Sequence, residues 1–215
     1  MIKTVVFDLD NTLYDYDYCN RIAEIELYRK MKTYFKIDTI NAEKLLADAK
    51  RNIKKRLGNT AASHNRLLYM QNICEQLNVK PGLYALKLYN AYWDVVLTNM
   101  QRYSYVLPLL ETLHKKKLVL GILTDLTAHI QYRKLEALEI SDFFDMIITS
   151  EEAGEDKPSD KMFNLLFEKT KNNPDELLMI GDSQEKDIAG AQKHGINTIL
   201  YTKHTDIIKE AEKYI

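Results

Sequence analysis

The stretch VVFDLDNTLYD, Val5 to Asp15, decides the fold, because an apolar run with β-branched residues ends there in two acids. Asp8 and Asp10 stand on either side of one leucine and are followed at once by Asn11 and Thr12. Continuous apolar residues are typical of a strand that is buried on both faces of a parallel sheet. Like charges at the end of such a strand repel each other unless they bind a partner. The stretch therefore predicts a binding site at the end of the first strand.

Short apolar segments of the same kind recur along the chain and alternate with segments whose apolar residues have helical spacing. Strand, crossover helix and strand in this order predict a parallel sheet with right-handed connections. The fold class that we expect is α/β, with a Rossmann-like parallel sheet and helices on both faces. The expected strands are Thr4–Leu9, Leu118–Thr124, Asp145–Ser150, Leu177–Asp182 and Asn197–Thr202.

The segment 16–102 differs from the rest, because it contains no strand pattern. Its apolar residues recur at helical spacing, and it is rich in tyrosine and poor in glycine and proline. We expect an all-helical insert of 16–102 between the first and second strands. The α/β core would then consist of 1–15 and 103–215.

Composition is ordinary for a globular protein that buries a core. The 215 residues are 46% hydrophobic and 28% charged, and the formal net charge is −1. This balance predicts neither a nucleic-acid partner nor a membrane partner. The cysteines, Cys19 and Cys74, lie far apart and fit free thiols in a reducing cytoplasm. We expect a cytoplasmic protein that is a monomer or a weak homodimer.

Polar residues stand at or just beyond the ends of the expected strands. Because the carboxyl ends of parallel strands meet at one edge of a sheet, these side chains should converge although they are distant in sequence. Helix capping by Asp, Ser or Thr explains any one of them, but it accounts poorly for the whole set. The set comprises Asp8, Asp10, Thr124, Asp125, Lys157, Asp182 and Asp187.

Several carboxylates that are crowded together require a cation. Mg²⁺ prefers a few carboxylate oxygens, water and phosphate oxygens as ligands. Asp8, the main-chain carbonyl of Asp10 and Asp182 could hold the metal, and Lys157 with the Thr124 hydroxyl could hold an anion that faces it. A magnesium site beside a lysine and a free carboxylate suits phosphoryl transfer.

The polar residues at the strand ends form motifs that are typical of a known family. The pattern D-x-D-x-T is present at Asp8, Asp10 and Thr12, a threonine ends the second strand at Thr124, and Lys157 precedes a proline. The acidic pattern G-D-x-x-x-x-D follows in IGDSQEKD, residues 180–187. These motifs in this order resemble the haloacid dehalogenase superfamily, in its phosphatase branch with a helical, C1-type cap inserted after the first strand.

The resemblance implies a role for each motif residue. Asp8 would be the nucleophile that forms an aspartyl-phosphate, and Asp10 would be the general acid and then the general base. Asp10 also distinguishes phosphatase relatives from dehalogenating ones, which lack this second aspartate. The remaining roles are phosphoryl binding by Thr124 and Lys157, metal binding by Asp182, orientation of Lys157 or of a metal-bound water by Asp187, and bracing of the first loop by Thr12.

One motif residue departs from the family pattern. Many relatives have asparagine after the motif threonine, whereas this chain has Asp125. A carboxylate that points at a phosphate is repulsive, so we expect the Asp125 side chain to turn away and its backbone N–H to serve the site.

Arg66 is the candidate for substrate recognition in the helical insert. It follows a glycine-containing break and opens a helix in the sequence AASHNRLLY. Two interpretations stay open: Arg66 reads a second anionic group of the substrate, or it is an exposed residue at a helix start.

The function that we predict is hydrolysis of a small phosphorylated metabolite by a Mg²⁺-dependent phosphatase. Two alternatives stay open. A phosphomutase of the same superfamily would keep both Asp8 and Asp10, and a regulatory or binding module could keep the fold without catalysis.

Overall fold

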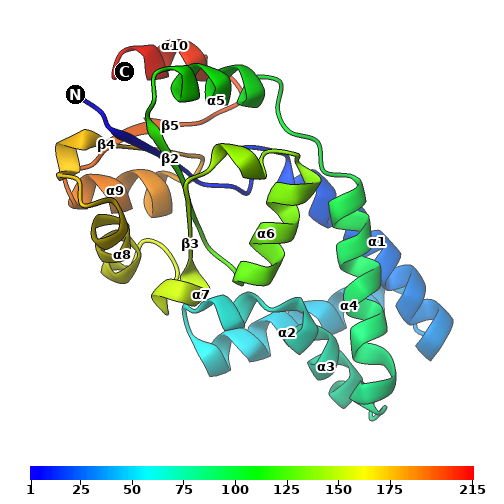
Figure 1. Cartoon of the computed structure of the whole chain (residues 1–215). Coiled ribbons are helices and arrows are strands. Elements are labelled where there is room, and N and C mark those ends of the chain that lie inside the picture. Colours follow the sequence, from blue (N-terminus) through cyan, green and yellow to red (C-terminus); the bar gives the residue numbers. More distant parts are fainter. The chain divides into compact units, whose positions relative to one another are not determined.

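The computed structural model describes all 215 residues and divides the chain into two compact units (Figure 1). One unit is formed by Met1–Asp15 together with Gln101–Ile215, and the other by Tyr16–Met100. The first unit contains every strand, and the second is entirely helical between its turns.

The first unit is built on a parallel sheet. Its strands are β1 Thr4–Phe7, β2 Val119–Thr124, β3 Met146–Thr149, β4 Leu177–Gly181 and β5 Asn197–Leu200. The five strands lie in the order β3-β2-β1-β4-β5. Every residue of β1 is buried, as the continuous apolar pattern predicted, and Phe7 lies in register opposite Ile122 of β2 and Ile180 of β4. The predicted α/β fold class is confirmed.

Helices cover both faces of this sheet. The helices of this unit are α5 Val106–Lys115, α6 Ala128–Ala137, α7 Ser150–Ala153, α8 Asp160–Thr170, α9 Gly190–Lys193 and α10 Ile207–Glu212, with short 3₁₀ turns η2 Ser141–Phe143 and η3 Pro174–Glu176. The helices α8 and α9 lie on one side of the sheet, and α5 and α10 lie on the other (Figure 1). Met162, Phe163 and Leu166 of α8 pack in one buried cluster with side chains from the strands.

The segment after β4 differs from the regular helix that its sequence suggests. It begins as a π-helical turn, η4 Gln184–Ala189, before α9. The Ser183 carbonyl accepts from the N–H groups of both Asp187 and Ile188, at 3.0 and 3.2 Å. The Asp187 carboxylate also folds back onto the Ser183 N–H at 3.0 Å. The widened turn thus brings an acidic side chain back to the end of β4.

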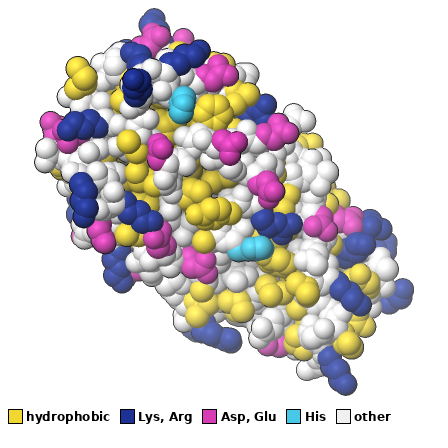
Figure 2. Space-filling view, viewed as in Figure 1, with side chains coloured by type: hydrophobic (Ala, Val, Ile, Leu, Met, Phe, Trp, Pro, Cys, Tyr) yellow, Lys and Arg dark blue, Asp and Glu magenta, His cyan; other side chains and the backbone are white.

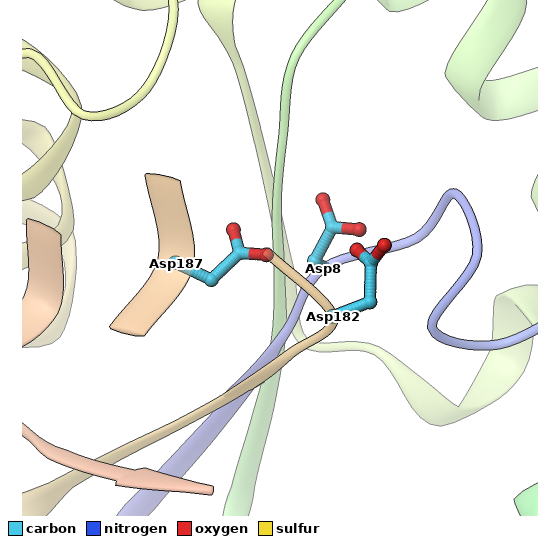
Figure 3. A group of neighbouring side chains, drawn as sticks. All are labelled: Asp8, Asp182 and Asp187. Atoms are coloured by element: carbon cyan, nitrogen blue, oxygen red, sulfur yellow. The ribbon is translucent and has the colours of Figure 1, made fainter. Parts of the chain in front are cut away.

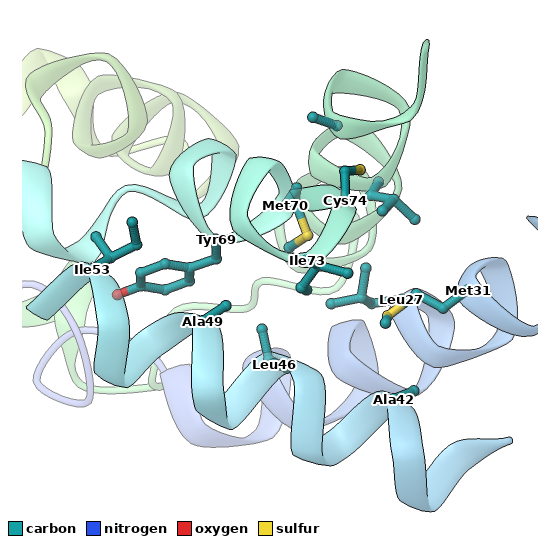
Figure 4. Packing of buried hydrophobic residues seen from close by; sticks show 12 residues of the cluster. Leu27, Met31, Ala42, Leu46, Ala49, Ile53, Tyr69, Met70, Ile73 and Cys74 are labelled. Atoms are coloured by element: carbon teal, nitrogen blue, oxygen red, sulfur yellow. The ribbon is translucent and has the colours of Figure 1, made fainter. Parts of the chain in front are cut away.

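The helical unit has its own hydrophobic core. Its elements are α1 Tyr16–Phe35, α2 Thr39–Leu57, η1 Ala61–His64, α3 Arg66–Gln76 and α4 Pro81–Thr98. Buried side chains of α1, α2, α3 and α4 form this core, and Figure 4 shows Leu27, Leu46 and Ile73 packed together in it. Asp38 caps α2 by accepting from Asn41 N–H at 2.8 Å, and Gly58 ends this helix with a φ of 66°.

The surface carries charges of both signs. Figure 2 shows one face of the molecule, on which acidic and basic side chains are interspersed, consistent with a net charge of −1. No helix combines the length and the apolar character that a membrane-spanning segment needs.

Candidate active site

The loop after β1 carries the first part of the site. The Asp8 N–H continues the sheet by donating to Ile180 O at 2.9 Å, and Asn11 turns the chain with a φ of 62°. This turn brings the Thr12 hydroxyl back to Asp8 Oδ2 at 3.2 Å and to Asp182 Oδ1 at 3.4 Å. Thr12 therefore connects the end of β1 to the end of β4.

Lys157 lies at the centre of the site, and its side chain is only 2% exposed. Its Nζ donates to Asp8 Oδ1 at 2.6 Å, to Asp187 Oδ1 at 2.6 Å and to Leu123 O at 2.9 Å. Three acceptors for three N–H donors satisfy the ammonium completely. Lys157 is thereby fixed between the ends of β1, β2 and the π-helical turn.

Three carboxylates converge at this edge of the sheet. Oxygen atoms of Asp8, Asp182 and Asp187 lie within 4.8 Å of one another, and Figure 3 shows the side chains gathered around one point. The close approach of Asp187 requires glycine at position 181, because a Cβ there would overlap the Asp187 carboxylate. Residues that are far apart in sequence thus form one acidic cluster.

The electrostatics of the cluster favour a cation. Burial raises the pKa of the Asp8 carboxyl to about 8, and the charges of Asp187 and Asp10 add to an increase that Lys157 opposes. Burial also raises the pKa of Asp182, with a contribution from Asp187. Burial disfavours the charge of Lys157, but Asp187 and Asp8 outweigh it and raise the pKa of this ammonium. The single positive charge of Lys157 does not balance the negative charges of the three carboxylates. Because all of their ligand atoms are oxygens, the cluster suits a hard divalent cation such as Mg²⁺.

The end of β2 supplies a hydroxyl and a charged loop residue. Thr124 is 1% exposed, and its Oγ1 accepts from Gln131 Nε2 at 2.6 Å. The Asp125 carboxylate accepts from the Lys157 backbone N–H at 2.8 Å and pairs with Lys186 Nζ at 2.8 Å. Both oxygens of Asp125 are therefore engaged by neighbouring loops, which gives a physical reason for an acid at this position.

Asp10 is held by Lys134, which our reasoning from sequence did not identify, and by Tyr14. Lys134 Nζ lies 2.7 Å from both carboxylate oxygens of Asp10, and the Tyr14 hydroxyl donates to Oδ1 at 2.7 Å. The signal was present in the sequence of α6. Gln131 and Lys134 share a helical stripe with the buried Leu135, and a polar residue in a core register requires a partner.

Arg66 lies in the helical unit and is buried rather than exposed at its helix start. Its guanidinium donates to His64 O at 2.9 Å and to the Tyr16 hydroxyl. It also lies over the rings of Tyr69 and Tyr92, at 5.4 and 5.6 Å from their centroids. None of these partners carries a carboxylate.

Comparison with known proteins places this chain in a family. The model of the haloacid dehalogenase-like hydrolases matches residues 5–201. The chain belongs to the haloacid dehalogenase-like hydrolase family. This membership confirms the superfamily that the motifs predicted, and the C1 type of the cap stays a prediction.

Several relatives of this hydrolase are phosphatases. It is 36% identical to ribulose-1,5-bisphosphate 5-phosphatase of Halopiger xanaduensis, over 99% of this chain and 91% of that protein. It is 30% identical to glyceraldehyde 3-phosphate phosphatase of Methanopyrus kandleri, over 93% of this chain and 83% of that protein. The predicted enzyme class, a phosphoric monoester hydrolase, is confirmed.

A solved structure of the family shares the fold. The hydrolase YfnB of Bacillus subtilis, bound to magnesium, superposes with a TM-score of 0.71 at 22% identity, over 96% of this chain and 92% of that one. At this level of identity the likeness shows the α/β fold with its helical insertion.

Proposed function

We propose that this hydrolase is a Mg²⁺-dependent phosphatase that cleaves a small phosphorylated metabolite through an aspartyl-phosphate on Asp8. The observation that carries the proposal is the position of the Asp8 carboxylate, 2.6 Å from Lys157 Nζ and within the three-carboxylate cluster. A nucleophilic carboxylate beside a fixed cation is what an in-line attack on a phosphate ester requires.

In the first step, Asp8 attacks phosphorus and a bond forms between its carboxylate oxygen and the phosphoryl group. The bond between phosphorus and the ester oxygen breaks, and Asp10 transfers its proton to that leaving oxygen. Lys157 holds Asp8 by a hydrogen bond of 2.6 Å, so the nucleophile is oriented before the substrate binds.

In the second step, the Asp10 carboxylate takes a proton from a water molecule. The resulting hydroxide attacks the phosphorus of the aspartyl-phosphate, the bond to Asp8 breaks, and inorganic phosphate leaves. Asp10 is then protonated again and Asp8 is again a carboxylate, so the cycle closes without any other reagent.

The phosphoryl group is bound, in this proposal, by the Thr124 hydroxyl and the Asp125 N–H. Lys157, whose three N–H donors are already engaged, contributes its positive charge to binding of that group. Asp8, the Asp10 carbonyl and Asp182 would hold Mg²⁺, which supplies positive charge that neutralises phosphoryl oxygens and lowers the repulsion within the acidic cluster. Thr12 keeps Asp8 and Asp182 together, and Asp187 orients Lys157.

The names of the relatives support a sugar phosphate as the substrate class. Two of the similar proteins act on ribulose-1,5-bisphosphate and on glyceraldehyde 3-phosphate. Arg66 remains our candidate for reading a second anionic group, and its support is a buried guanidinium whose contacts are neutral.

The test is phosphate release from a panel of sugar phosphates and from p-nitrophenyl phosphate, with Mg²⁺ and with EDTA. We expect turnover that EDTA abolishes and Mg²⁺ restores, and that Asp8→Asn removes while the protein stays folded. Lys193→Met is the matched control, because Lys193 pairs with Asp160 at an exposed position. Full activity in Asp8→Asn would refute the assignment of the nucleophile.

A further inference from the structure

The ion pair between Lys134 and Asp10 is unusual in its burial. The Lys134 side chain is 0% exposed and the Asp10 side chain is 23% exposed, and Nζ lies 2.7 Å from both carboxylate oxygens. Tyr14, which is also fully buried, adds a hydrogen bond to Oδ1. The proposed general acid is therefore clamped from the interior by two side chains of the α/β unit.

Stability alone is a poor reason for this arrangement. Burying an ammonium costs several kcal/mol, on the order of what its ion pair returns, and a hydrophobic residue of similar volume often serves a core position equally well. The Asp10 side chain is partly exposed, so water can solvate its charge and no buried cation is needed to stabilise it. An interior lysine that is directed at one catalytic carboxylate fits a role in positioning that carboxylate.

The place of Lys134 in the fold supports the same role. It stands one turn after Gln131 on α6, the helix that follows the loop of Thr124 and Asp125. Gln131 Nε2 donates to Thr124 Oγ1 at 2.6 Å and to Asp125 O at 2.7 Å. One buried polar stripe of α6 thus contacts both the phosphoryl-binding hydroxyl and the general acid.

We propose that Lys134 is a positioning residue for Asp10, which it holds with Tyr14 so that Oδ2 exchanges the proton with the leaving oxygen and with water. Oδ1 accepts from both residues, whereas Oδ2 accepts from Lys134. The proton moves from Oδ2 to the leaving oxygen as the ester bond breaks, and it returns from water in the second step. Lys134 keeps its own protons throughout. The inference rests on the proposed function.

The experiment compares Lys134→Met with the wild type on phosphate esters that differ in leaving group. A misplaced general acid matters most for a poor leaving group, and general acid–base catalysis contributes about 10²- to 10⁴-fold. We compare kcat/KM, which reports the steps up to departure of the leaving group and not the later hydrolysis of the aspartyl-phosphate, in which Asp10 acts on every substrate alike. We expect kcat/KM on an alkyl ester, such as glycerol phosphate, to fall about 100-fold or more. On p-nitrophenyl phosphate, whose leaving group needs no proton, we expect kcat/KM to fall by less than about 10-fold.

A double-mutant cycle separates positioning from packing. If Lys134 acts through Asp10, the double variant Asp10→Asn with Lys134→Met is no slower on the alkyl ester than Asp10→Asn alone. Losses that multiply, or equal losses on both esters, would overturn the inference. Lys193→Met, which removes an exposed lysine–aspartate pair, is the control and should match the wild type.

The outcomes distinguish this inference from the proposed function. If the loss of activity in Asp10→Asn is the same for both leaving groups, the proposed role of Asp10 is wrong. If the loss depends on the leaving group in Asp10→Asn but not in Lys134→Met, only the positioning role of Lys134 is wrong. Melting temperatures report whether Lys134→Met folds. Should it not fold, Tyr14→Phe removes the second contact to Asp10, and we expect the same selectivity in a weaker form; equal losses on both esters would overturn the clamp.

Discussion

Replacing Asp8 by asparagine should change how the stability of the Mg²⁺-free protein depends on pH. Burial raises the pKa of Asp8 from 3.8 to about 8, so the folded state binds this proton more tightly than the unfolded state does. The free energy of unfolding therefore falls as pH rises between these two values, by up to about 1.4 kcal/mol for each pH unit. The amide of the Asp8→Asn variant does not titrate, so the variant lacks this contribution.

The measurement is urea unfolding of the wild type and of Asp8→Asn in EDTA, at intervals from pH 5 to pH 8. The difference between the two proteins cancels the titration of groups that do not interact with Asp8. We expect the wild type to lose stability relative to the variant across this range, by on the order of several kcal/mol in total. Saturating Mg²⁺ should restore the wild type by binding its folded state. A difference that is independent of pH, or that changes in favour of the wild type as pH rises, would refute the reasoning.

Three further substitutions test the rest of the site. Lys157→Met leaves its two carboxylate partners without a cation, so we expect a loss of about 3–5 kcal/mol in urea unfolding together with loss of turnover; near-wild-type stability would contradict the central role of this lysine. Gly181→Ala places a methyl group on Asp187, and we expect a lower melting temperature and a lower kcat, whereas a silent substitution would show that the close approach is dispensable. Asp125→Asn loses its ion pair with the partly exposed Lys186 but keeps an oxygen for the Lys157 N–H, so we expect a change in unfolding free energy below about 1 kcal/mol.

Much of the fold follows from the sequence, because buried parallel strands leave an unmistakable pattern. The runs around Val5, Ile122 and Met179 lack the alternation of a half-exposed sheet, and each lies in a strand that is buried on both faces. The position of the acidic residues followed from the same rule, since parallel strands bring their carboxyl ends to one edge. The sequence therefore predicts that Asp8 and Asp182 lie close together, as they do in the structure.

Other features depend on tertiary geometry that local patterns do not encode. The π-helical turn arises because Asp187 must reach back past Gly181, a constraint between two strand ends that a helical periodicity does not reveal. The engagement of Asp125 by Lys186 likewise depends on how two loops pack. Lys134 is an intermediate case. Its spacing in the sequence places it on the buried face of α6, but the sequence does not identify Asp10 as its partner.

The most direct test of the proposed nucleophile is chemical trapping of the phosphorylated enzyme. During turnover of a sugar phosphate with Mg²⁺, the protein is treated with borohydride, which reduces an aspartyl-phosphate to homoserine, and its peptides are sequenced by mass spectrometry. We expect homoserine at position 8, dependent on substrate and lacking in Lys157→Met. Sustained turnover that leaves Asp8 unmodified while another residue carries the phosphoryl group would contradict this mechanism.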